Sequence, residues 1–193
     1  MCIRDSNIGN LPVGNIDAII TSPPYEAALE GTSRHTRGGI ASRDKKLAQT
    51  GSYTILTEDT KKGVPVCYSP NPQNIGNLKS SDEEYENLRR GLMTKDGKPT
   101  YLSEMLKVYR EMWKVLKPGG RAIVVVKPFI RNKKVVDLPY HTYLLMRLAG
   151  FELEQLYKLR LKQQSFWRIL YYKKFPEVPR IAHEYVIVAR KSS

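Results

Sequence analysis

The strongest chemical signal in the sequence is a tetrapeptide at the end of a short apolar run. Residues 16–21 (IDAIIT) are rich in β-forming side chains, and Ser22, Pro23, Pro24 and Tyr25 follow them directly. A proline has no N–H for a sheet ladder, so strand pairing must stop before Pro23, and two prolines in succession hold the backbone extended and stiff. The stretch predicts a rigid support at the exit of a buried strand. On it the hydroxyl of Ser22, the carbonyl of Pro23 and the ring of Tyr25 would stand in a fixed relation.

The chain carries a large positive charge. Its 193 residues include 32 Lys and Arg against 19 Asp and Glu, which gives a net charge of +13. An excess of this size favours a polyanion as partner, nucleic acid first. The apolar content of 41% is ordinary for a globular domain, and no apolar run approaches the ~20 residues of a membrane span. A basic protein without a polyanionic partner is the alternative.

Two basic segments are candidates for contact with such a partner. Residues 26–80 are rich in Gly, Ser, Thr, Asn, Lys and Arg and show no periodicity, so this part of a predicted insertion at 26–99 is either functional or mobile. Residues 162–180 interleave aromatic rings with cations, a pattern that favours base stacking and phosphate contact. The alternative for residues 26–80 is an ordinary solvated loop. The alternative for residues 162–180 is that the rings cover the sheet. The residues that we predict to bind nucleic acid are Arg34, Arg37, Arg43, Lys45, Lys46, Trp167 and Arg168.

The rest of the pattern predicts the elements that position these residues. Ser81 with Glu84 forms a capping box, Thr100 and Asp137 precede further helical periodicities, and glycines follow two of the helices. Apolar runs or alternation indicate strands at 16–21, 121–129, 151–161 and 183–191, with a loop before the last, and helices at 82–93, 100–116 and 137–150. This alternation predicts an α/β fold around a mainly parallel sheet, with the 16–21 strand buried on both faces.

Cysteine and histidine carry no evident chemistry. Cys2 and Cys67 form no disulfide framework, which fits a reducing cytoplasm. The three histidines are scattered and show no metal-ligand spacing, so we expect no metal. His183 and Glu184 open the last predicted strand, where a structural pair is the preferred interpretation over a catalytic one.

Two motifs, in this order and on these elements, resemble the S-adenosylmethionine-dependent amino-methyltransferases of DNA. They are the Ser-Pro-Pro-Tyr sequence after an apolar strand and the Leu-Lys-Pro-Gly-Gly sequence at 116–120 before the next one. The resemblance extends over nearly the whole chain from Asn7. It implies a Rossmann-like methyltransferase sheet, of which this chain supplies strands four to seven, the last antiparallel. It also implies S-adenosylmethionine as cofactor, duplex DNA with a flipped base as partner, and cytosine N4 over adenine N6 as target.

The resemblance places Ser22, Pro23, Pro24 and Tyr25 in the catalytic site and gives three of them a direct role. An exocyclic amine is a poor nucleophile because its lone pair is conjugated into the base. Ser22 Oγ and the Pro23 carbonyl would accept its two N–H groups, and Tyr25 would stack on the flipped base. Base–aromatic stacking is worth roughly 1–3 kcal/mol, comparable to the few kcal/mol that flipping costs. An RNA base methyltransferase and a nucleic-acid-binding protein without catalysis are the alternatives.

The family's cofactor-binding residues are missing from the sequence. We find no Gly-rich turn between a strand and a helix, because residues 7–15 (NIGNLPVGN) neither follow a strand nor open a helix. The first six residues, MCIRDS, resemble a translated sequencing adapter. We therefore expect residues 7–193 to be the C-terminal part of one catalytic domain whose cofactor half lies upstream. A permuted order, with that half downstream, is the alternative. The chain by itself is expected to bind S-adenosylmethionine weakly or not at all.

Overall fold

The computed structural model describes residues 11–24, 26, 75–92, 99–131, 133–164 and 166–192. Two compact units divide the chain, the first comprising 1–23, 82–97 and 102–193 and the second comprising 24–81 and 98–101. All the strands of the described residues lie in the first unit. Most of the predicted insertion at 26–99 lies outside the described residues.

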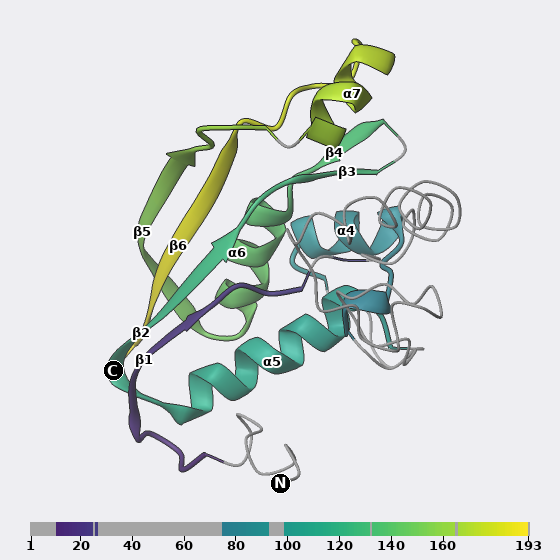
Figure 1. The fold of residues 1–193 in the computed structure, drawn as a ribbon. Coiled ribbons are helices and arrows are strands. Elements are labelled where there is room, and N and C mark those ends of the chain that lie inside the picture. The colour runs from purple at the N-terminus through teal and green to yellow at the C-terminus, as the bar shows by residue number, and fades with distance from the viewer. Residues whose placement is uncertain are drawn as a thin grey trace, which may run out of the picture. The chain divides into compact units, whose positions relative to one another are not determined.

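A four-stranded mixed sheet forms the centre of the first unit (Figure 1). Its order is β1 (Ile16–Thr21), β2 (Leu116–Val126), β6 (His183–Lys191) and β5 (Phe151–Arg160). β1 pairs with β2 in parallel, and β6 is antiparallel to both of its neighbours. Three strands therefore run in one direction and the last strand runs against them, as the resemblance implied.

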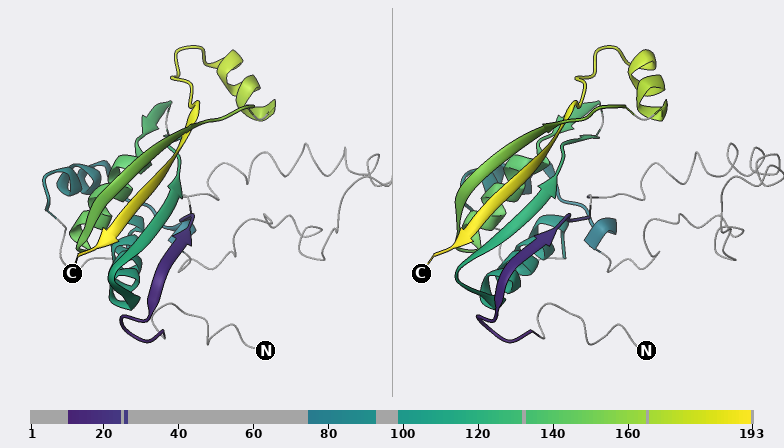
Figure 2. Two further views of the ribbon diagram at one scale, coloured as in Figure 1. Left: turned by 90° about the vertical axis from the view of Figure 1, so that its left-hand side faces the viewer. Right: turned by 60° about the vertical axis from the view of Figure 1, so that its left-hand side comes forward.

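Three helices lie on one side of this sheet. They are α4 (Asp82–Arg89), α5 (Tyr101–Val115) and α6 (Leu138–Leu148). The left view of Figure 2 shows the opposite face of the sheet toward the viewer, with these helices behind it. The core between helices and sheet is made of apolar residues at helical spacing on α5, such as Leu102 and Met105, and of alternate strand residues.

The helices begin where the sequence predicts. Asp137 is the N-cap of α6, and its carboxylate accepts a hydrogen bond from the Tyr140 N–H at 3.2 Å. Pro139 lies in the first turn, where its missing N–H costs nothing. In α4, three acidic residues occupy the first turn, where their charges interact favourably with the positive end of the helix dipole. This helix ends earlier than predicted, at Arg89.

The Leu-Lys-Pro-Gly-Gly segment belongs to β2 and causes an irregularity at its start. The register passes from Ile16 opposite Leu116 to Ala18 opposite Arg121, so the segment bulges out of the ladder. A Cβ at Gly120 would lie 2.9 Å from the Lys117 carbonyl oxygen and 3.0 Å from that of Asp17, which explains the glycine.

Three expectations need correction. The segment predicted as an aromatic and basic loop contains a helix, α7 (Phe166–Lys174), because Tyr172 is buried and the rings of Tyr171 and Phe175 meet at 5.0 Å across one helical turn. A hairpin of β3 (Phe129–Arg131) and β4 (Lys134–Val136) follows β2 and was not predicted.

The third correction concerns β1, which was expected to be buried on both faces. Ala18 is exposed, and the side chain of Ile20 is 73% exposed, because no layer covers that face of the sheet in the described residues.

Candidate base-binding site at the carboxyl end of β1

The predicted support begins one residue after β1. Ser22 follows the last strand residue, Thr21, and is exposed, whereas Pro23 is buried. This is the carboxyl end of the parallel pair β1 and β2, the edge at which open α/β sheets bind their ligands. The position therefore suits a residue that contacts substrate.

A hydrogen bond across the sheet fixes the Ser22 hydroxyl. Its Oγ donates to the main-chain carbonyl of Val125 in β2 at 3.0 Å. A hydroxyl has one proton and two acceptor lone pairs. Because Val125 takes the proton, Ser22 Oγ offers only lone pairs to a ligand. It can then accept from an N–H group, such as the amino group of a base.

The carbonyl of Pro23 is the second predicted acceptor. Among the described residues, no donor reaches it. Pro23 itself has a fixed φ and a buried ring, which limit the directions its carbonyl can take. The roles of Ser22 and Pro23 as acceptors stay predictions.

The second unit contains two polar contacts that the sequence did not reveal. Tyr101, at 1% exposure, donates its hydroxyl to the Pro24 carbonyl at 2.8 Å. The buried carboxylate of Glu26 accepts the Ser80 N–H. These bonds satisfy buried polar groups around the second proline. The carbonyl of Pro24 is therefore engaged by the protein, whereas no described residue donates to that of Pro23.

An ion pair lies at the same end of the sheet in the first unit. Lys127, directly after β2, places its Nζ 3.4 Å from Oε1 of Glu184 at the start of β6. The two side chains are 28% and 32% exposed. The structural interpretation of His183 and Glu184 stays a prediction. The lysine was missed because it looked like the end of an apolar run.

Most of the other predicted residues cannot be placed. Tyr25, and the basic residues from Arg34 to Lys46, lie outside the described residues. Trp167 belongs to α7, but its side chain is outside the description, whereas Arg168 lies on α7 and is partly exposed. α7 follows β5, which runs in the same direction as β1. The chain therefore leaves β5 toward α7 at the same edge of the sheet at which Ser22 follows β1.

The described residues lack two further features. No group of three or more His, Cys, Asp or Glu among them could hold a metal ion. No helix there has both the length and the apolar character that a membrane span requires.

Comparison with known proteins identifies the fold. No protein-family model matches the chain, and no curated protein matches it. Among solved structures, TTHA0409 of Thermus thermophilus, a candidate DNA modification methylase complexed with S-adenosyl-L-methionine, is 17% identical with a TM-score of 0.50, over 96% of this chain and 52% of that one. The PvuII DNA methyltransferase, cytosine-N4-specific, is 16% identical with a TM-score of 0.50, over 96% and 45%.

The chain spans about half the length of these structures. The likeness confirms the α/β, Rossmann-like methyltransferase fold that the two sequence motifs implied.

Proposed function

We propose that this chain is the base-binding part of an S-adenosylmethionine-dependent DNA methyltransferase that modifies the exocyclic amine of a flipped base, cytosine N4 in preference to adenine N6. The observation that carries the proposal is the bond from Ser22 Oγ to the Val125 carbonyl, because it leaves the serine as an acceptor at the ligand-binding edge. The likeness in fold to a cytosine-N4-specific enzyme and the charge of +13 support a DNA substrate.

The chain's own residues would prepare the amine for reaction. Ser22 Oγ accepts one amine N–H and the Pro23 carbonyl accepts the other, which draws the nitrogen out of conjugation and frees its lone pair. Both acceptors are fixed before the base arrives, so they stabilise the positive charge that develops on the nitrogen. Tyr25 stacks on the flipped base and holds it against the support.

The cofactor does not fit the described residues. β1 is an edge strand of the described sheet, so no described strand lies on the side of it away from β2 to carry a Gly-rich turn. Gly14, the one described glycine of residues 7–15, donates its N–H to the Lys114 carbonyl at 3.0 Å and so joins the end of α5. We therefore assign no residue to S-adenosylmethionine, which when bound supplies an electrophilic methyl group.

We further propose that residues 7–193 belong to a longer native reading frame, and the test is methyl transfer by the complete protein that this reading frame encodes. Labelled S-adenosylmethionine is offered with duplex DNA and, separately, with structured RNA, and the modified nucleoside is identified by mass spectrometry. We expect label in duplex DNA as N4-methylcytosine. Label in RNA alone would replace the proposal with an RNA base methyltransferase. No transfer to either substrate would leave a nucleic-acid-binding protein without catalysis.

A further inference from the structure

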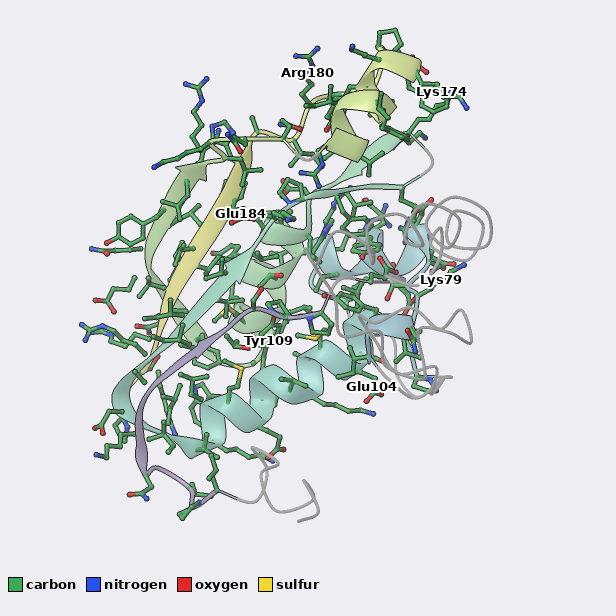
Figure 3. The ribbon with its side chains drawn as sticks, viewed as in Figure 1. Lys79, Glu104, Tyr109, Lys174, Arg180 and Glu184 are labelled. Atoms are coloured by element: carbon green, nitrogen blue, oxygen red, sulfur yellow. The ribbon has the colours of Figure 1, made fainter. Side chains whose placement is uncertain are left out.

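Two unpredicted elements gather cations at the same edge of the sheet as Ser22. The hairpin of β3 and β4 follows β2 directly, and α7 follows β5. We define the basic platform as Lys133, Lys134, Lys173, Lys174 and Arg180, all exposed. Figure 1 shows the hairpin beside α7, and Figure 3 shows Lys174 and Arg180 pointing away from the ribbon.

Contacts of one lysine join the hairpin to the chain after α7. Lys133 Nζ lies 4.4 Å from the centroid of the Phe175 ring and 3.0 Å from Oε1 of Glu177. Lys174 Nζ lies 5.4 Å from the centroid of the same ring, which packs against Tyr171 at 5.0 Å. A cation over an aromatic ring is attracted by the negative face of the ring. The two elements therefore present their cations on one connected surface.

The backbone of Lys133 is unusual. Its φ is +62°, and it is the one non-glycine residue in the described part of the chain with positive φ. Glycine or asparagine would occupy this position of a two-residue hairpin turn with less strain. A strained lysine at the tip of a hairpin points to a role for its side chain.

The charges of the platform are poorly balanced. Glu177 contacts Lys133, whereas Lys134, Lys173, Lys174 and Arg180 form no ion pair with any carboxylate that the structure describes. Cations gathered in this way repel one another, and an anion between them relieves the repulsion. Phosphates of a nucleic-acid backbone suit a basic surface with aromatic rings beside it.

We propose that the basic platform binds the phosphate backbone next to the base that is presented to Ser22. The inference deepens the proposed function and rests on its nucleic-acid substrate. The position of the platform at the carboxyl edge of the sheet favours nucleic acid, because the strand that offers the base must pass this edge. Ile169 and Leu170 are exposed on α7, so an anionic membrane is the competing ligand that the test must include.

Binding of a fluorescently labelled DNA duplex to the 193-residue chain, followed by anisotropy over a salt series, tests the platform. Lys134→Gln with Lys174→Gln removes two of its cations. The matched control, Arg110→Gln with Arg147→Gln, removes two exposed cations from α5 and α6. We expect the platform variant to lose roughly tenfold in affinity per cation at 0.1 M salt and to reduce the salt slope by about one per cation. The control should change far less.

A second variant, Lys133→Gly, separates a loss of DNA contacts from a loss of folding. Glycine relieves the positive φ, so the melting temperature should stay within a few degrees, while the loss of the contacts to Phe175 and Glu177 should still lower DNA affinity several-fold. Unchanged affinity in both platform variants, equal losses in platform and control variants, or tighter binding to phosphatidylserine vesicles than to DNA would overturn the inference. Platform-dependent binding without methyl transfer by the native reading frame would overturn only the proposed function.

Discussion

The two faces of the four-stranded sheet have different surroundings. On the face toward the helices, Ala122, Val124 and Ile187 are buried completely. On the other face, Ile20 is 73% exposed and Leu159 50% exposed. The same strands supply both sets of residues, because alternate side chains point to opposite sides. Within the described residues, tertiary packing therefore stabilises the sheet from one side only.

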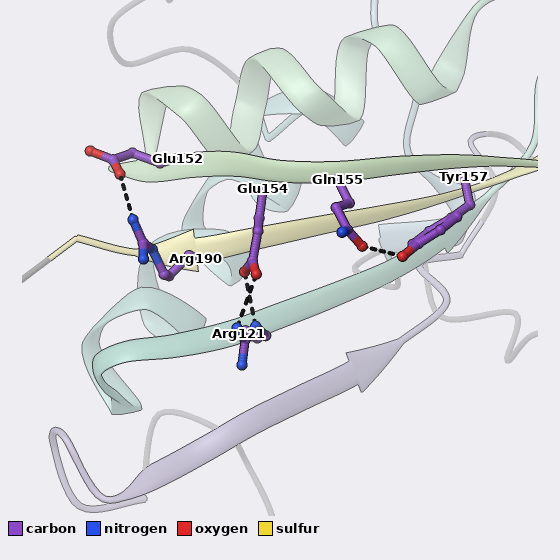
Figure 4. Close-up of polar contacts among 6 residues, drawn as sticks. All are labelled: Arg121, Glu152, Glu154, Gln155, Tyr157 and Arg190. Atoms are coloured by element: carbon purple, nitrogen blue, oxygen red, sulfur yellow. Dashed lines mark hydrogen bonds and ion pairs between the residues drawn. The ribbon is translucent and has the colours of Figure 1, made fainter.

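The open face is not uniform. Farther from Ser22, Arg121 of β2 forms two hydrogen bonds of 2.9 Å with Glu154 of β5, and Oε2 of Glu152 lies 3.7 Å from Nη2 of Arg190 (Figure 4). Toward the Ser22 end, the same face also exposes large apolar side chains, among them Ile20 and Leu159. Charged cross-strand pairs stabilise the sheet while exposed to solvent, whereas an exposed isoleucine or leucine adds little stability because its side chain is not removed from water. The difference between the covered face and the open face predicts that the same substitution changes the free energy of unfolding by different amounts on the two faces.

The largest effect is expected from a buried isoleucine. Ile187→Ala should lower the free energy of unfolding by about 3–4 kcal/mol, because it leaves a cavity under the helices. The matched substitution on the open face, Ile20→Ala, should cost less than about 1 kcal/mol. Urea unfolding of both variants measures the two values. Equal losses would mean that the open face is packed in solution.

The covered side also carries a pH-sensitive group. His141 is 1% exposed, its ring lies 4.5 Å from that of Tyr85, and neither ring nitrogen has a hydrogen-bond partner among the described residues. Burial, with a smaller effect from Arg89, lowers its pKa to about 4. The unfolded chain takes up this proton near pH 6.5 and the folded chain does not. Stability should therefore fall as the pH drops from about 6.5 to about 4.

The expected loss over this range is about 2–3 kcal/mol. Urea unfolding at several pH values measures it. His141→Phe keeps a ring against Tyr85 and removes the titration, so this variant should lose the slope between pH 6.5 and 4. A slope that persists in His141→Phe would assign the effect to other groups.

The smallest effect is expected on the open face. The hydrogen bonds from Arg121 lower the pKa of Glu154. A carboxylate with a lowered pKa stabilises the fold above its ordinary pKa, and the contribution disappears as the pH falls through the lowered value. Glu154→Gln should therefore change stability slightly at neutral pH and not at all in strong acid, because solvent screens the exposed pair. A loss of stability in Glu154→Gln as large as that in Ile187→Ala would contradict the difference between the two faces of the sheet.

The sequence predicted the elements that local rules determine. The capped helix α6, the amphipathic α5 and the strand β6 follow from Asp137, from three-and-four spacing and from an apolar run. The hairpin was missed because its turn has no glycine and Lys133 adopts the left-handed conformation instead. The bond from Ser22 to Val125 joins residues 103 positions apart, so it depends on a strand register that no local pattern specifies.

The central claim is that Ser22 Oγ accepts a hydrogen bond from the reacting amine. The most direct measurement is the rate of methyl transfer to duplex DNA by the native reading frame carrying Ser22→Ala, with Ser192→Ala as the control. We predict a fall of about 10²–10³-fold in turnover for Ser22→Ala, an unchanged melting temperature, and partial recovery in Ser22→Asn, whose amide carbonyl is also an acceptor. Near-normal turnover of Ser22→Ala would contradict the account.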